Sequence, residues 1–192
     1  MTDALLSLAL GIGLAAACGF RVFLPLLALS IAAKGGFVPL SGGFEWIGTT
    51  PALVAFATAT LIEIVAYYVT WLDHVLDVIA TPAAMFCGVI AAASVMTDMP
   101  PLLRWTAAVV GGGGAAGVVQ GATVLLRLKS AALTGGLANP LVATAELFGS
   151  ASTAILALVV PALAFLLISG LCIAVFLMSG RFLFGRQDAA SE

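Results

Sequence analysis

Residues 19–29 read GFRVFLPLLAL, and they place an arginine and a proline inside a long apolar run. Pro25 lacks a backbone donor and should break or kink a helix close to Arg21. A charged side chain at the centre of a membrane-spanning helix costs about 2.5–3.5 kcal/mol on insertion scales, so Arg21 needs a buried partner. The stretch therefore predicts a broken helix that carries a buried charge.

The composition around this stretch predicts a membrane protein. Of the 192 residues, 62% are hydrophobic and 8% are charged, and the mean hydropathy is +1.22. Soluble domains carry about 25% charged residues, which this chain cannot supply. A span needs roughly 20 apolar residues, and such runs lie at 5–33, 52–72, 78–96, 105–126 and 153–178. We expect an all-α polytopic transmembrane helical bundle, one domain over residues 1–192.

The number and direction of the spans follow from these runs. Five spans are expected, or six if a long one is broken into half-helices, and Pro161 predicts such a break in the last run. Five spans would place the loop cations unequally on the two sides of the membrane. Four would lie on one side, Lys34, Arg104, Arg181 and Arg186, and two on the other, Arg127 and Lys129. The positive-inside rule places the N-terminus outside and the C-terminus in the cytoplasm of a bacterial inner (plasma) membrane.

Several classes of protein are disfavoured. No basic n-region precedes the first apolar run, so a cleaved signal peptide is not expected. The net charge of −2 argues against nucleic acid as a partner. Three cysteines inside the spans have no metal spacing and are expected to be small apolar side chains: Cys18, Cys87 and Cys172. No catalytic set or HExxH motif occurs, so we expect no enzyme, no cofactor and no metal site.

The two halves of the chain resemble each other at an offset of 100 residues. Residues 11–36 and 111–136 agree at nine of 26 positions, and both windows close on Gly-Gly before a proline, as KGGFVPL and TGGLANPL. We expect repeats over 4–97 and 104–180, of inverted topology because the first would hold three spans. Secondary transporters use such repeats and bind solutes where discontinuous helices meet. A duplicated bundle that transports nothing fits the same pattern.

Charged and polar residues near the middle of the first two spans suggest a site. Arg21 and Glu63 lie at similar depth, which predicts a buried ion pair. Polar residues continue from Glu63 at i+4, i+7, i+11 and i+14, as Tyr67, Thr70, His74 and Asp77, with Asp73 just off this line. On an unbroken helix they cover about 80° of arc and could pass protons or cations. A purely structural ion pair and a wet turn at the aspartates are the simpler alternatives.

Small residues recur every fourth position in two spans. One set is Gly113, Gly117 and Gly121, and the other is Gly11, Ala15 and Gly19. Such spacing lets helix backbones approach closely where lipid supplies no hydrophobic force. We expect close helix contacts here, either between the repeats or between subunits.

Three stretches together resemble one protein family. GFRVFLPLLAL, the glutamate and LDHVLD segment followed by Pro82 and Gly88, and TGGLANP resemble small bacterial membrane proteins that carry the domain of unknown function 4126, over roughly residues 5–178. TGGLANP followed by Glu146 is the most specific part. In the family pattern an Asp-Lys pair and a proline follow the first glutamate, whereas this chain has Tyr67, Tyr68 and Thr70. The resemblance implies the fold and the membrane location, and it names no substrate.

The leading functional expectation is a small transporter or channel for an ion or small polar solute, with its site between the repeats. The candidate binding residues are Arg21, Glu63, Tyr67, Asp73, Asp77, Thr134, Gly135, Gly136, Asn139 and Glu146. Glu63 would titrate or bind a cation, Arg21 would be its counter-charge or an anion contact, and the second Gly-Gly segment would supply polar ligands at partial membrane depth.

Two alternatives remain open from the sequence: a non-transporting scaffold or assembly protein, and a lipid-handling, scramblase-like protein. The expected partners are the lipid bilayer, further copies of the chain in a homo-oligomer, and the small ion or solute.

Overall fold

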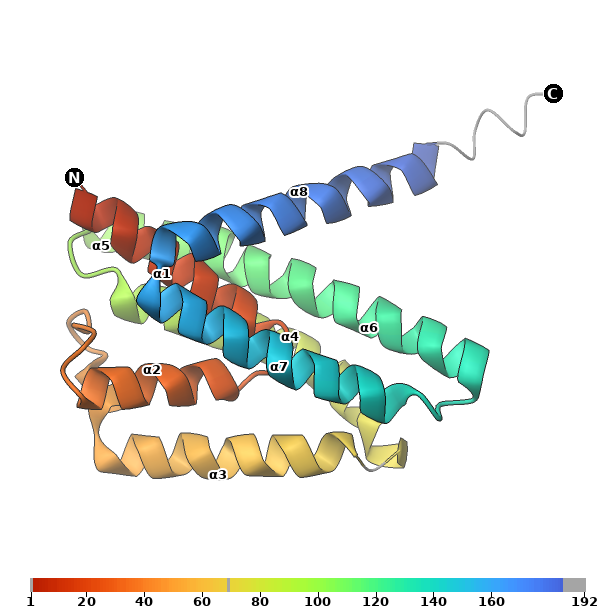
Figure 1. Cartoon of the computed structure of the whole chain (residues 1–192). Coiled ribbons are helices and arrows are strands. Elements are labelled where there is room, and N and C mark those ends of the chain that lie inside the picture. Colours follow the sequence, from red (N-terminus) through yellow and green to blue (C-terminus); the bar gives the residue numbers. More distant parts are fainter. Residues whose placement is uncertain (1, 69, 185–192) are drawn as a thin grey trace.

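The chain is all-α, as the sequence predicts. The structure, a computed structural model, describes residues 2–68 and 70–184, and their side chains except at 2, 70–78, 176 and 178–184. Its elements in order are α1 (Thr2–Cys18), α2 (Leu24–Lys34), η1 (Glu45–Gly48), α3 (Thr50–Tyr67), α4 (Thr70–Val95), α5 (Pro101–Ala107), η2 (Ala108–Gly113), α6 (Gly114–Thr134), α7 (Asn139–Val159) and α8 (Pro161–Phe184). Figure 1 shows their arrangement.

Residues 19–23 form a buried turn that reverses the chain between α1 and α2. The first helix starts at the end of the molecule that holds the N-terminus, and α2 returns toward that end (Figure 1). Pro25 stands in the first turn of α2, where a missing N–H costs no helical hydrogen bond. The expected span over 5–33 is therefore wrong as a single helix, because the break at Pro25 is a complete reversal.

The later helices run back and forth along the molecule (Figure 1). α3 leads away from the N-terminal end, α4 returns, α5, η2 and α6 form one continuous rod, α7 returns, and α8 leaves the bundle. The helix break expected at Pro161 is confirmed, so residues 153–178 belong to two helices. Among the described residues, three helices are long and apolar enough to cross a membrane: Thr50–Tyr67, Pro101–Thr134 and Asn139–Val159.

The polar stripe expected on one unbroken helix is divided between two. α3 ends at Tyr67 and α4 begins at Thr70, and the two helices run in opposite directions (Figure 1). Residues 67–70 are aromatic or β-branched and lower the helix propensity, and T-x-x-D at 70–73 is the sequence pattern of a new helix start. Asp73, His74 and Asp77 belong to α4, but their side chains lie outside the described part of the structure.

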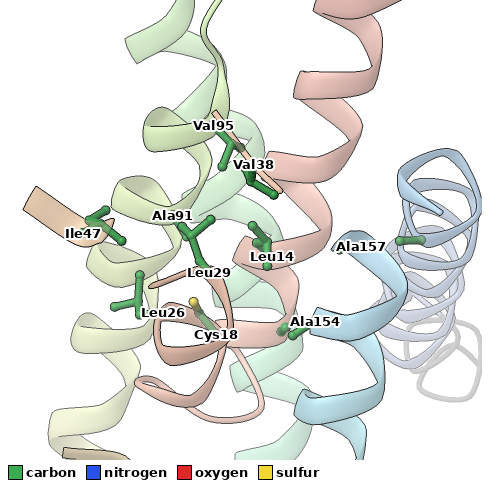
Figure 2. Packing of buried hydrophobic residues seen from close by; sticks show 12 residues of the cluster. Leu14, Cys18, Leu26, Leu29, Val38, Ile47, Ala91, Val95, Ala154 and Ala157 are labelled. Atoms are coloured by element: carbon green, nitrogen blue, oxygen red, sulfur yellow. The ribbon is translucent and has the colours of Figure 1, made fainter. Parts of the chain in front are cut away.

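The hydrophobic core surrounds the second half of α1. This helix contacts α2, α4, α6, α7 and α8, and Leu14 and Cys18 are fully buried on it. Figure 2 shows them packed with Leu26 and Leu29 from α2 and with Ala154 from α7. Because the turn at 19–23 follows directly, its backbone is carried into the interior.

Glycines bring α1, α4 and the rod of η2 and α6 into close contact. A Cβ at Gly112 would lie 2.7 Å from the Cβ of Ala92 and 3.0 Å from the carbonyl oxygen of Gly88. A Cβ at Gly19 would lie 2.5 Å from the carbonyl oxygen of Ala116. The close contacts expected from small residues therefore occur within one chain.

The helix pattern gives the predicted repeat no support, and the repeat stays a prediction. Residues 19–23 are a turn whereas 119–123 lie inside α6, and 45–48 are a short 3-10 helix whereas 146–149 lie inside α7. The two Gly-Gly turns, at 35–36 and 135–136, lie at opposite ends of the bundle (Figure 1).

The expected division of the loop cations is wrong as well. α2, which ends at Lys34, and α5, which includes Arg104, lie near the end where α1 begins, whereas α8, which includes Arg181, leads to the opposite end (Figure 1). Arg186 lies outside the described residues. Arg127 belongs to no loop, because it lies within α6. The orientation in a membrane stays a prediction.

The contact at Gly19 makes a testable prediction. Gly19→Ala should lower the free energy of unfolding by about 1–3 kcal/mol, because the added methyl group meets backbone that cannot move aside. The matched control is Gly121→Ala, since a Cβ there meets nothing within 4 Å. Thermal unfolding in detergent measures both variants, and equal midpoints would contradict the close approach of α1 to α6.

Candidate functional site

Five buried side chains from four parts of the chain gather in a cluster that we call the polar centre. Each is at most 8% exposed. They are Arg21 from the turn at 19–23, Glu63 and Tyr67 from α3, Arg127 from α6, and Glu146 from α7. All of them except Arg127 belong to the candidate residues expected from the sequence.

Glu63 caps the N-terminus of α2. Its Oε1 accepts a hydrogen bond of 2.8 Å from the amide of Val22, and its Oε2 accepts one of 3.1 Å from the amide of Phe23. The first amides of a helix have no partner within the helix, and a negative charge is favoured beside them. Glu63 therefore holds the chain reversal in place from a separate helix.

Arg127 and Glu146 form a two-pronged ion pair between α6 and α7. The Nε of Arg127 donates a hydrogen bond of 2.8 Å to Oε1 of Glu146, and its Nη2 donates a second one to Oε2. Such paired bonds fix the direction of both groups as well as their distance. The expectation that Arg127 is a loop cation is wrong, and its place opposite Glu146 follows from the helical hairpin around TGGLANP.

Arg21 reaches toward α7 instead of pairing with Glu63. Its Nη2 donates a hydrogen bond of 2.7 Å to the carbonyl oxygen of Ala143 and lies 3.8 Å from Oε2 of Glu146. The predicted direct pair of Arg21 and Glu63 is therefore wrong, because the carboxylate of Glu63 is directed at the amides of Val22 and Phe23. Glu63 and Glu146 both interact favourably with the charge on Arg21.

Tyr67 joins the two arginines. The Cζ atoms of Arg21 and Arg127 each lie 4.0 Å from the centroid of its ring. The negative face of an aromatic ring attracts a guanidinium group, and more strongly where water is excluded. The ring offsets part of the repulsion between two like charges that share one cluster.

The Gly-Gly segment of the second half lies outside the polar centre. Gly135 and Gly136 have φ of 62° and 89° and form the turn between α6 and α7, at the end of the bundle (Figure 1). Thr134 is exposed, and its hydroxyl accepts a hydrogen bond of 3.1 Å from the amide of Ala138. The glycines and Thr134 thus close a helical hairpin, whereas Asn139 is buried at the start of α7.

The chemistry of the polar centre is that of fixed charges. It combines two guanidinium groups, two carboxylates and a helix N-terminus, all held by hydrogen bonds or short contacts. Among the described side chains, no group of three His, Cys, Asp or Glu is placed to hold a metal ion.

The chain belongs to the DUF4126 family. The model of this family, described as "Domain of unknown function (DUF4126)", matches residues 8–181, which confirms the resemblance carried by GFRVFLPLLAL and TGGLANP. No curated protein and no solved structure matches the chain.

The cap at α2 predicts that Glu63 needs both of its oxygens. Glu63→Gln should lower the free energy of unfolding by about 1–3 kcal/mol, because one amide loses its acceptor and faces an NH₂ group. Glu45 accepts a hydrogen bond from the amide of Gly43 but is exposed, so Glu45→Gln is the matched control and should change little. Thermal unfolding of the detergent-solubilised variants measures the difference, and two equally stable variants would refute the cap.

The ion pair predicts an asymmetry between its two partners. Glu146→Gln leaves two buried arginines without this carboxylate and should cost about 3–5 kcal/mol of stability. Arg127→Gln should cost less, because Glu146 keeps its contact with Arg21. The exposed Lys129 provides the control, since Lys129→Gln should stay within about 0.5 kcal/mol. Chemical unfolding measures the loss of stability in the three variants. A larger loss for Arg127→Gln than for Glu146→Gln would contradict the prediction that Glu146 serves both arginines.

Proposed function

We propose that this DUF4126 member is a small integral membrane transporter or channel for an ion or small polar solute, and that the polar centre is its site. One observation carries the proposal: an irregular, charged stretch of backbone at 19–23 is buried among long apolar helices. Irregular backbone at membrane depth is tolerated only inside protein or beside a water-filled cavity, and ionisable residues there mark ion and solute paths.

The membrane topology that we propose has five crossings and one re-entrant hairpin. α3, α4, the rod of α5 to α6, α7 and α8 would each cross the bilayer. α1 has 17 residues and α2 has 11, which correspond to about 26 Å and 16 Å against a hydrocarbon core of about 30 Å. α2 is too short to cross, so α1 and α2 would dip into the membrane and bring Arg21 to its interior.

The proposed solute path follows from the way α2 is used. Discontinuous helices in transporters point their N-termini at the bound solute or ion near the membrane midplane. Here the N-terminus of α2 points into the polar centre, where Glu63 caps it. Because α3, α6 and α7 each contribute one charged side chain to the polar centre, a shift of one of them would change the electrostatic field at a bound solute.

A non-transporting assembly protein is the second candidate, and the end of α8 favours it. This helix leaves the bundle (Figure 1), and Ile173 and Leu177 are both 60% exposed on it. Such a free apolar face would suit a homo-oligomer or another membrane partner. A lipid-handling role has less support, because the groove of about 300 Å³ between α1 and α8 is lined by apolar side chains such as Leu5 and Phe165.

Flux through reconstituted protein tests the proposal. Proteoliposomes with the wild-type chain should show faster flux of at least one small ion, across a panel of H⁺, Na⁺, K⁺ and Cl⁻, than empty liposomes. Arg21→Gln should reduce this flux at least tenfold, because a charge at the proposed site is lost. Lys129→Gln, on the exposed surface, is the control and should leave flux unchanged.

Two outcomes would overturn the transport proposal. One is wild-type protein, folded by circular dichroism, whose flux equals that of empty liposomes for every ion tested. The other is full flux in a folded Arg21→Gln variant. A different pair of results would support the assembly candidate instead. The liposomes would show no flux, and cysteines introduced along α8 would cross-link one copy of the chain to another.

A further inference from the structure

We infer that Arg21 binds a small inorganic anion, of about the size of chloride, in the polar centre. This deepens the proposed function, because it names the class of the solute, and it rests on that function for the claim that the bound ion is also the transported one.

Arg21 has donors that the surrounding protein leaves unused. The residue is 2% exposed, and within the described part of the chain only its Nη2 donates a hydrogen bond, to Ala143. Its Nε and Nη1 are buried and have no hydrogen-bond partner among the described residues. A buried N–H group of a charged side chain is costly without an acceptor, so a bound acceptor is expected beside these two atoms.

The charges around Arg21 favour an anion over water as this acceptor. Both oxygens of Glu146 accept from Arg127, and both oxygens of Glu63 accept from the amides of Val22 and Phe23, just before α2. Arg21 retains a contact of 3.8 Å with Glu146, which is longer than a hydrogen bond. Its hydrogen bond goes to a neutral carbonyl, its ring contact is with Tyr67, and Glu63 attracts it without a hydrogen bond. Among the described side chains, no carboxylate therefore accepts a hydrogen bond from Arg21.

The enclosure of the polar centre limits the size of the ligand. Its five side chains are at most 8% exposed, so a bulky organic anion or a lipid headgroup has no open surface from which to reach Arg21. The free donors exclude a bare cation as their ligand, because Nε–H and Nη1–H groups bind acceptors. A monatomic ion or a similarly small oxoanion satisfies both conditions.

The first experiment measures anion binding without a membrane gradient. The detergent-solubilised wild-type chain is heated in sodium chloride and in sodium gluconate at matched ionic strength. The melting midpoint should rise steadily with chloride and not with gluconate, because a ligand that binds the folded state stabilises it by mass action. Line broadening of the ³⁵Cl resonance by the protein gives an independent measure, and inorganic phosphate serves as the test for a larger oxoanion.

Variants at Arg21 locate the effect. Arg21→Lys keeps the charge but loses the planar set of donors, so the apparent chloride affinity should fall about tenfold or more. Arg21→Gln should abolish the chloride effect, and Lys129→Gln should retain the wild-type response. Where a variant at Arg21 fails to fold, the wild-type comparison of chloride with gluconate and the ³⁵Cl signal still decide the inference.

The results separate this inference from the proposed function. Equal midpoints in chloride and gluconate, with no line broadening, would overturn it and leave water as the partner of Arg21. A phosphate effect without a chloride effect would overturn the stated size. Chloride binding that depends on Arg21 supports the inference even if liposomes show no flux, in which case only the transport proposal fails. Cation flux without a chloride effect would support transport and overturn anion binding at Arg21.

Discussion

The hydrogen bonds from the amides of Val22 and Phe23 to Glu63 are the contacts on which the rest of the arrangement depends. A helix that begins in the interior leaves amides that water cannot reach, and they need an acceptor. Glu63 supplies both the acceptor atoms and the favoured negative charge from α3. With the start of α2 fixed in this way, Arg21 is directed toward α7, and the two arginines and Glu146 come together around Tyr67.

The carboxylates of the polar centre both compensate the buried arginines and hold the helices in place by hydrogen bonds. Two carboxylates lie beside two guanidinium groups, but Glu63 accepts hydrogen bonds from amides at the start of α2 and Glu146 accepts them from Arg127. Buried charge networks of this kind are strongly destabilised by removal of one member, since the remaining charges lose their partner in a medium of low polarity. The side chains that would contact a bound solute are therefore also the ones on which the stability of the fold depends.

Composition and local pattern predict a good part of this structure. Apolar runs indicate the helices, and Pro25 and Pro161 mark two of the breaks, because the effect of a proline is local. Three of the residues singled out from the sequence, Arg21, Glu63 and Glu146, lie in one buried cluster, and their role as a site stays a prediction. The partners inside the cluster could not be predicted, since they depend on how α3, α6 and α7 cross. Arg127 resembled a loop residue because it lies near the end of an apolar run.

The polar groups of the turn at 19–23 depend on partners that are synthesised much later than the turn itself. The carboxylate that accepts from the amide of Val22 lies 41 residues later, at Glu63, and the carbonyl that accepts from Arg21 lies 122 residues later, at Ala143. Domains form as the chain is made from its N-terminus. The amides of the turn therefore gain their acceptor once α3 has been made, whereas the hydrogen bond of Arg21 needs α7 as well.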